Sequence, residues 1–269
     1  MEGTLVEKAQ ELLVAQKDGV VTFTLNRPEV LNALTMGMMK ALIDGLKKAE
    51  RDKATRVVII TASGRAFCAG ADLGDLQKRQ TQKAFSLGDE LRDHFNPLIL
   101  QIRKMEKPVI GAVNGLAAGA GASLVLSCDL KVCAQEAKFI NAFVRVGLVP
   151  DSGMTYYMPR FLGYSLALEH AWLAKPVLAE QALRAGWVNR VVPAAELMSA
   201  AEALAAELSA QPPLALALTK RAINRSLESG LEEQMEYEAQ LQEILGKTKD
   251  HQEGVKAFLE KRPPQFKGE

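Results

Sequence analysis

The chain of 269 residues has few of the features that identify several common classes of protein. Its three cysteines, Cys68, Cys128 and Cys133, form no CxxC pair, which argues for reduced thiols and against a disulfide framework or a zinc site. The three histidines are far apart in sequence, and none has the spacing of a metal ligand. A formal net charge of +1 gives no electrostatic basis for binding nucleic acid or an anionic membrane.

Long apolar segments are also missing. Residues 1–19 are charged throughout and lack the apolar core of a signal peptide. The longest apolar run, residues 116–128, is too short and too rich in glycine to span a bilayer. We therefore expect a cytoplasmic protein with no membrane partner, no nucleic-acid partner and no metal site.

Strand patterns alternate with helix patterns through most of the chain. Residues 19–26 alternate and are β-branched, whereas residues 36–52 carry apolar side chains at helical spacing. Continuous apolar runs are typical of strands that are covered on both faces. Strands are predicted at residues 19–26, 55–62, 107–115 and 130–135, and helices at residues 36–52 and 121–129. This alternation predicts an α/β fold with βαβ units and a largely parallel sheet.

The C-terminal part has a different character. From residue 196 onward the pattern is helical, with interruptions at Pro212, Pro213 and Gly230. We therefore divide the chain into a core, residues 1–195, and a helical C-terminal region, residues 196–269. The apolar stripes of these helices need a partner, so the region should pack on the core or on another subunit.

Two turns of small residues each follow a predicted buried strand. One lies within residues 64–73 and the other within residues 114–124. Taken alone, the first is best interpreted as a tight turn with Asp72 as a helix N-cap, and the second as close helix packing. Taken together, the two turns can lie at one edge of a sheet. One backbone N–H from each would then form an oxyanion hole for a polarised carbonyl.

Asp151 is an isolated acid within the apolar run 146–154, with no cation nearby in sequence. Partial burial would raise its pKa toward the range of a proton shuttle. An N-cap role is the alternative, in which the carboxylate accepts N–H bonds from Gly153 or Met154. The residues alone favour neither interpretation.

Five motifs, in order along almost the whole chain, resemble the crotonase (enoyl-CoA hydratase/isomerase) superfamily. They are LNRPEVLNALT, RAFCAGADL, KPVIGAVNGLAAGAG, VGLVPDSG and FLEKRPPQF. The resemblance implies a crotonase-like spiral of ββα units with a helical C-terminal trimerisation region. It implies acyl-CoA substrates, a homotrimer or a hexamer built as a dimer of trimers, and no cofactor beyond the CoA of the substrate. It also implies that the N–H groups of Ala71 and Ala120 hold the thioester carbonyl.

The positions of the catalytic carboxylates differ among the branches of this family. Two glutamates activate water in the hydratases, and Ser123 and Phe143 stand at the matching positions here. A phenyl ring is no base, and a serine needs an activating partner, so efficient hydration is disfavoured. Asp151 matches the catalytic aspartate of several isomerase branches. Within the family, the chain most resembles the ring-epoxide isomerases of phenylacetyl-CoA breakdown, which form an oxepin thioester and also shift enoyl double bonds.

The resemblance therefore implies a CoA-thioester isomerase with Asp151 as its acid/base. Two alternatives stay open: a 2-enoyl-CoA hydratase with an unrecognised water-activating group, and a non-catalytic member that binds acyl-CoA. The former predicts hydration that survives loss of Asp151, and the latter predicts binding without turnover. A dehalogenase is disfavoured, because that branch carries histidine and tryptophan where Asn96 and Phe143 stand.

Further ligand contacts are implied by position in the family. The residues expected to contact CoA are Arg27, Ala69, Asp72, Leu73, Phe258 and Lys261, with Phe258 beside the adenine and often supplied by a neighbouring subunit. The acyl pocket is expected to include Asn96, Ser123 and Phe143, although a helix-capping role for Asn96 is equally compatible with the sequence. Residues 74–95 are expected to cover the pocket, and they carry no pattern that fixes the acyl group.

Overall fold

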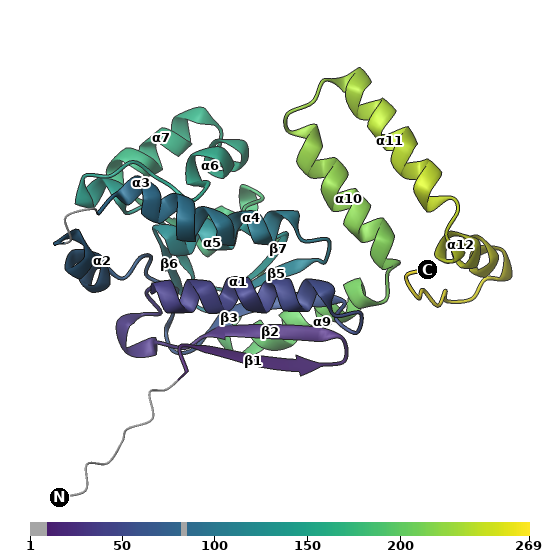
Figure 1. The fold of residues 1–269 in the computed structure, drawn as a ribbon, viewed down its shortest axis with the longest axis horizontal. Helices are drawn as coiled ribbons and strands as arrows, with labels where there is room; N and C mark the ends of the chain where they lie inside the picture. The colour runs from purple at the N-terminus through teal and green to yellow at the C-terminus, as the bar shows by residue number, and fades with distance from the viewer. Residues whose placement is uncertain (1–9, 82–84) are drawn as a thin grey trace, which may run out of the picture.

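The computed structural model describes residues 10–81 and 85–269, and its fold is drawn in Figure 1. Residues 1–9 belong to the N-terminal segment that was expected not to be a signal peptide. Residues 82–84 belong to the segment that was expected to cover the pocket. Both stretches lie outside the described residues.

A six-stranded sheet forms the centre of the molecule, and it contains the four strands predicted from the sequence. The β1–β2 pair is antiparallel, and the remaining neighbours are parallel. The strand order is β1 (Leu12–Lys17), β2 (Val20–Leu25), β3 (Val57–Ala62), β5 (Val109–Val113), β7 (Leu130–Ala134) and β10 (Arg190–Val192).

A second sheet consists of four short strands, the first three of which alternate along the chain with strands of the large sheet. Its order is β4 (Ala66–Cys68), β6 (Leu116–Ala118), β8 (Lys138–Ile140) and β9 (Pro176–Leu178). β3, β5 and β7 of the large sheet are each followed by one short strand of the small sheet. α2 (Leu73–Gln80) then follows β4, and α5 (Ala120–Ser127) follows β6. These successive ββα units form the spiral that the family resemblance implied.

Both faces of the large sheet are covered, which is why β3 is buried at every residue. Val58 and Ile60 point into the main core, on the side of α1 (Met36–Arg51) and α4 (Asn96–Lys104). Val57 and Ile59 point the other way and pack against α9 (Leu197–Ser209). The period of two along a strand divides one continuous apolar run between two cores.

The remaining helices lie around and beyond this core. The chain between β4 and α9 also forms α3 (Leu87–Glu90), the π-helical turn η2 (Leu91–Phe95), the 3₁₀ turn η3 (Phe143–Val146), α6 (Met154–Leu162), α7 (Tyr164–Leu173) and α8 (Ala179–Arg184). Two further 3₁₀ turns are η1 (Pro28–Val30) and η4 (Ala194–Glu196). None of the helices in the described part of the chain is long and apolar enough to cross a membrane.

The C-terminal helices divide between the core and the periphery. α9 covers the sheet, whereas α10 (Pro213–Ser226), α11 (Leu231–Leu245) and α12 (Lys249–Glu260) extend to one side (Figure 1). The Nζ atom of Lys220 connects α10 to the core by donating to Ile102 O at 2.9 Å and to Asp129 Oδ2 at 2.7 Å. The predicted breaks at Pro212 and Gly230 are confirmed, because each residue immediately precedes a helix.

Candidate active site

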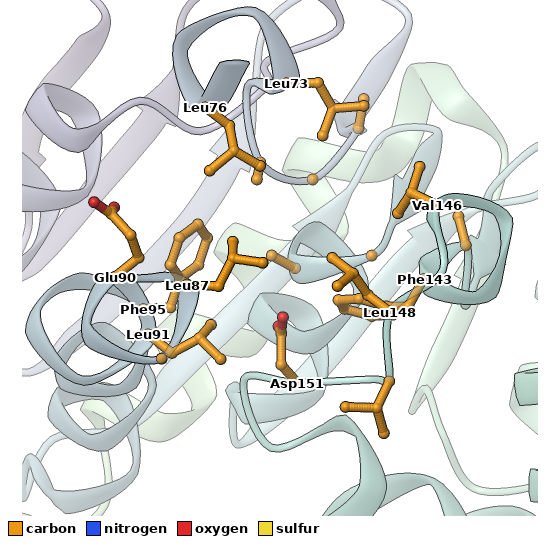
Figure 2. A pocket seen from close by; sticks show the side chains of 18 residues that line it. Leu73, Leu76, Leu87, Glu90, Leu91, Phe95, Phe143, Val146, Leu148 and Asp151 are labelled. Carbon is orange, nitrogen blue, oxygen red and sulfur yellow. The ribbon is translucent and has the colours of Figure 1, made fainter. Parts of the chain in front are cut away.

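A cavity of about 320 Å³ opens beside the small sheet and is lined mainly by apolar side chains and glycines (Figure 2). Its walls come from the turn after β4, from α2, from α3 and η2, from the start of α5, and from η3 and the loop after it. Asp151 and Glu90 are the charged side chains among the described residues that line it. The Glu90 carboxylate is paired with Arg79, and Figure 2 shows it pointing away from Asp151.

The turns after β4 and β6 meet at this cavity. β4 and β6 are parallel neighbours, so both turns lie at the carboxyl end of the small sheet. A Cβ atom placed on Gly70 would lie 3.1 Å from Ala118 O and 3.6 Å from Ala120 N. Gly70 has φ +103°, so glycine permits both this backbone conformation and the close approach. The predicted juxtaposition of the two turns is therefore present, although they follow the short strands and not the long ones.

The N–H groups of Ala71 and Ala120 are available to a ligand. Leu34 N donates to Gly70 O at 2.8 Å, and Asp72 N donates to Leu34 O at 3.0 Å. Because successive peptide groups in extended chain face opposite sides, the N–H of Ala71 points away from Leu34. Ala120 is the first residue of α5, where an N–H has no acceptor within its helix. Both residues line the cavity, so their N–H groups are candidates for holding an anionic oxygen there.

Close docking of α5 on β4 maintains this arrangement. A Cβ atom on Gly121 would lie 2.4 Å from the carbonyl oxygen of Cys68, closer than real Cβ atoms approach such an atom. The Cys68 thiol accepts a hydrogen bond from Gly70 N at 3.4 Å. Burial raises the pKa of Cys68 to about 12, so the thiol stays protonated. Cys68 therefore shapes the turn and is not a nucleophile.

Gly121→Ala is expected to destabilise the fold by about 1–3 kcal/mol, because α5 must move away from β4. The same movement displaces Ala120 N, so kcat should fall by about tenfold. Gly37→Ala is the matched control, because a Cβ atom on that helical glycine meets nothing closer than 3.6 Å. Thermal unfolding and steady-state kinetics of the two variants test this. Equal kinetics in both variants would contradict the role assigned to α5 docking.

Asp151 lies in the loop between η3 and α6, and its carboxylate points into the cavity (Figure 2). Burial raises the pKa of this carboxyl above its ordinary value, and the hydrogen bond from Ser152 Oγ to Asp151 Oδ1, at 2.8 Å, opposes the rise. The capping alternative is not realised: Gly153 precedes α6, which has no side-chain cap. Met154 N instead donates to the backbone oxygen of Asp151 at 2.9 Å, which leaves the carboxylate facing the cavity.

The three residues expected in the acyl pocket lie in three different environments. Phe143 lines the cavity. Ser123 is fully buried beneath it, and its Oγ donates to Asp151 O at 3.1 Å. Asn96 lines a second hollow, between α4, α6 and α10, and not this cavity, so the structure does not bring it together with Phe143. Neighbouring helical residues point about 100° apart, and it is Phe95 that faces the cavity. Nor does Asn96 act as a cap, because α4 begins without one.

Four of the residues expected to contact CoA lie together at one side of the cavity. Ala69 and Leu73 line it. Asp72 caps α2 by accepting from Gly74 N at 3.0 Å, which confirms its predicted capping role. Arg27 Nη1 donates to Asp72 Oδ2 at 2.9 Å and to Ala33 O at 2.7 Å.

The two remaining CoA candidates are distant from the cavity within one chain. Phe258 lies on α12 and Lys261 directly follows that helix, in the peripheral part of the C-terminal region (Figure 1). The Phe258 side chain is 83% exposed. Within one chain, the structure therefore does not bring Phe258 and Lys261 together with the other CoA candidates.

Residues 74–95 were expected to cover the pocket, and α2, α3 and η2 supply an apolar wall from this segment, although its lining side chains were not predicted. Leu87, Leu91 and Phe95 line the cavity, and so does Leu76 of α2. The signal was present, because Leu87, Leu91 and Phe95 are spaced four residues apart within the predicted covering segment. Within residues 10–81 and 85–269, no group of three His, Cys, Asp or Glu side chains is placed to bind a metal ion.

Comparison with known proteins gives consistent matches over nearly the full chain. A family model described as enoyl-CoA hydratase/isomerase matches residues 15–269. The 1,2-epoxyphenylacetyl-CoA isomerase of Escherichia coli is 44% identical over 250 residues, which cover 93% of this chain and 95% of that protein. The 2,3-dehydroadipyl-CoA hydratase of Escherichia coli is 36% identical, covering 96% and 99%. The crystal structure of an enoyl-CoA hydratase from a Polaromonas species superposes with a TM-score of 0.90 at 34% identity, covering 95% and 99%.

Proposed function

The chain belongs to the enoyl-CoA hydratase/isomerase family, and from this premise we propose that it is an isomerase of CoA thioesters. One observation carries the proposal. Among the described residues that line the cavity, Asp151 is the one whose unpaired carboxylate points into it, and Ala71 and Ala120, whose N–H groups we assign to an oxyanion hole, line the same cavity. Neither Ser123 nor Phe143 supplies the second carboxylate that water activation in the hydratases employs.

The proposed reaction needs only a base and an oxyanion hole. The thioester oxygen accepts hydrogen bonds from Ala71 N and Ala120 N, which stabilise the enolate that forms on deprotonation. Asp151 removes a proton from the carbon beside the carbonyl and returns it to another carbon of the conjugated system. No atom is gained or lost, so the substrate is isomerised. The apolar walls exclude water, which would otherwise compete as proton donor or nucleophile.

The proposed substrate is a ring-epoxide of phenylacetyl-CoA or a 3-enoyl-CoA. The 44% identity to the Escherichia coli isomerase supports this choice. So does a cavity of about 320 Å³ with apolar walls, at the lower end of the usual range for small-molecule sites. Asp151 would open the conjugated path to the oxepin thioester by removing a proton from the carbon between the ring and the carbonyl.

Purified protein should be offered the ring-epoxide thioester, a 3-enoyl-CoA and crotonyl-CoA in separate reactions, with products separated from substrate by chromatography and then identified by mass. Conversion of either of the first two to a product of unchanged mass supports the proposal. Addition of water to crotonyl-CoA, with no isomerisation of the other two, supports a hydratase instead. Binding of all three without turnover supports a non-catalytic member of the family.

The assembly and the CoA contacts are part of the same proposal. A homotrimer or a dimer of trimers would bring Phe258 and Lys261 of one subunit to the CoA bound by another. In this assembly α12 would cover the CoA of its neighbour, which accounts for the exposure of the Phe258 side chain.

The pH dependence of the isomerisation follows from the burial of Asp151. The carboxyl must be ionised to act as the base, and burial raises its pKa above the ordinary value. As the pH falls, kcat/KM should therefore begin to decline at a higher pH than an exposed aspartate would give. A profile of kcat/KM against pH for a 3-enoyl-CoA measures this. A flat profile down to the ordinary range of aspartate would contradict the assignment.

A further inference from the structure

Two buried serines fix Asp151 at two different points. Ser123 Oγ, from α5, donates to the backbone oxygen of Asp151 at 3.1 Å. Ser152 Oγ donates to the carboxylate oxygen Oδ1 at 2.8 Å. Ser123 is 0% exposed and Ser152 is 4% exposed, so water does not compete strongly for either bond. One serine holds the main chain of Asp151, and the other holds its side chain.

The backbone around Ser152 is strained. Ser152 has φ +52° and Gly153 has φ +82°, so two consecutive residues are left-handed. Glycine accepts this conformation readily, but a buried serine at positive φ is uncommon. Such strain persists where neighbouring contacts fix the conformation, often at a functional site. The sharp turn brings Met154 N to Asp151 O, at 2.9 Å, and aims the carboxylate at the cavity.

We propose that Ser123 and Ser152 are positioning residues, which hold Asp151 in the orientation needed for proton transfer. This inference rests on the proposed function, because it assigns the two serines through the carboxylate that they contact. Ser123 ties the loop to α5, whose first residue, Ala120, supplies one N–H of the oxyanion hole. Base and oxyanion hole are thereby fixed relative to one another. Ser152 selects the rotamer of the carboxylate and stabilises its ionised form.

The groups around Asp151 allow the effect of Ser152 on the pKa of the Asp151 carboxyl to be tested separately. Glu90, on α3 across the cavity, is paired with Arg79 and turned away. On the far side of the Ser152 turn, Tyr157 of α6 and Arg103 of α4 line the second hollow. The pKa of Asp151 reflects burial, which raises it, and the Ser152 hydroxyl, which lowers it.

Ser152→Ala and Ser152→Gly provide a matched pair, because both remove the hydroxyl and only glycine relieves the positive φ. In both variants, the acid limb of the kcat/KM profile should move to higher pH, since the ionised carboxylate loses a donor. Ser152→Gly should be the more stable of the two. An acid limb at the wild-type pH in both variants would overturn the role of Ser152.

Ser123→Ala and Ser127→Ala test the other contact. Both serines are fully buried on α5, but Ser127 Oγ donates to Leu124 O at 2.7 Å, away from Asp151. Ser123→Ala should lower kcat about tenfold or more with KM nearly unchanged, because the base is displaced while binding persists. Ser127→Ala should retain the wild-type kcat. Equal kcat values in the two variants would overturn the role of Ser123.

Failure of the positioning roles can be distinguished from failure of the proposed function. If Asp151→Asn retains wild-type isomerisation, Asp151 is not the base and the proposed mechanism fails first. If Asp151→Asn is inactive while Ser152→Ala, Ser152→Gly and Ser123→Ala all match the wild type, only the positioning roles fail. Both the mechanism and the positioning roles are supported if Asp151→Asn is inactive, the acid limb is shifted in the two Ser152 variants, and kcat is lower in Ser123→Ala.

Discussion

Asp151→Asn is expected to lower kcat for the isomerisation by roughly 10²- to 10⁴-fold, the usual contribution of a positioned acid/base. The amide has the shape of the carboxylate, but it cannot accept a proton from carbon near neutral pH. No other unpaired carboxylate lines the cavity among the described residues, because Glu90 is bound to Arg79. KM should change little, since the N–H groups of Ala71 and Ala120 and the apolar walls are unaltered.

The stability of this variant serves as an internal control. Burial raises the pKa of Asp151 in the folded state, so the fold favours its neutral form. The stability from this group is present below the pKa of the unfolded chain and is lost as pH rises through the folded pKa. Near neutral pH the neutral asparagine should therefore leave the protein at least as stable as the wild type. Thermal unfolding near pH 7 measures this, and a marked loss of stability would contradict the burial of the ionised carboxylate.

Ala120→Pro is expected to lower kcat by about 10²- to 10³-fold, because it deletes one donor of the oxyanion hole. Ala120 is the first residue of α5, the helical position where proline is best tolerated. The residue before it, Gly119, has φ +51°, and glycine is the residue that best accommodates that conformation. The loss should appear in kcat more than in KM, because the hydrogen bond strengthens as the enolate forms.

Tyr164→Pro provides the matched control for this substitution. Tyr164 is the first residue of α7, it also follows a glycine of positive φ, and it is 76% exposed. Circular dichroism and kinetics of both proline variants separate loss of the N–H from general damage to a helix. Wild-type kcat in a folded Ala120→Pro variant would show that this N–H does not hold the thioester oxygen.

Hydrophobic pattern was sufficient to predict β2, β3, β5 and β7 of the large sheet, but not its edge strands β1 and β10 and not the small sheet. Residues 57–60 form an unbroken apolar run, which is typical of a strand covered on both faces, and every residue of β3 is buried. β4 and β6 have three residues each, too short for a period to show in the sequence. They nevertheless determine the site, because the turns that follow them carry the two N–H groups.

The parts of the candidate site that depend on the position of the backbone could be predicted from the sequence. The parts that depend on the direction of a side chain were harder to predict. Asp151, Ala71 and Ala120 meet at one cavity, as their positions in the family implied. Phe95 lines the cavity whereas its neighbour Asn96 lines a second hollow, because neighbouring helical residues point in different directions. The hydrogen bond from Ser123 to Asp151 joins residues 28 positions apart, and no local pattern in the sequence reveals it.

The most direct test offers a 3-enoyl-CoA to the wild-type protein and to Asp151→Asn in deuterated water, with crotonyl-CoA in parallel. A single carboxylate that removes and returns a proton should shift the double bond and introduce solvent deuterium. Asp151→Asn should do neither, and neither protein should hydrate crotonyl-CoA efficiently. Hydration of crotonyl-CoA by both proteins, with no migration of the double bond, would contradict the account and require a water-activating group elsewhere in the cavity.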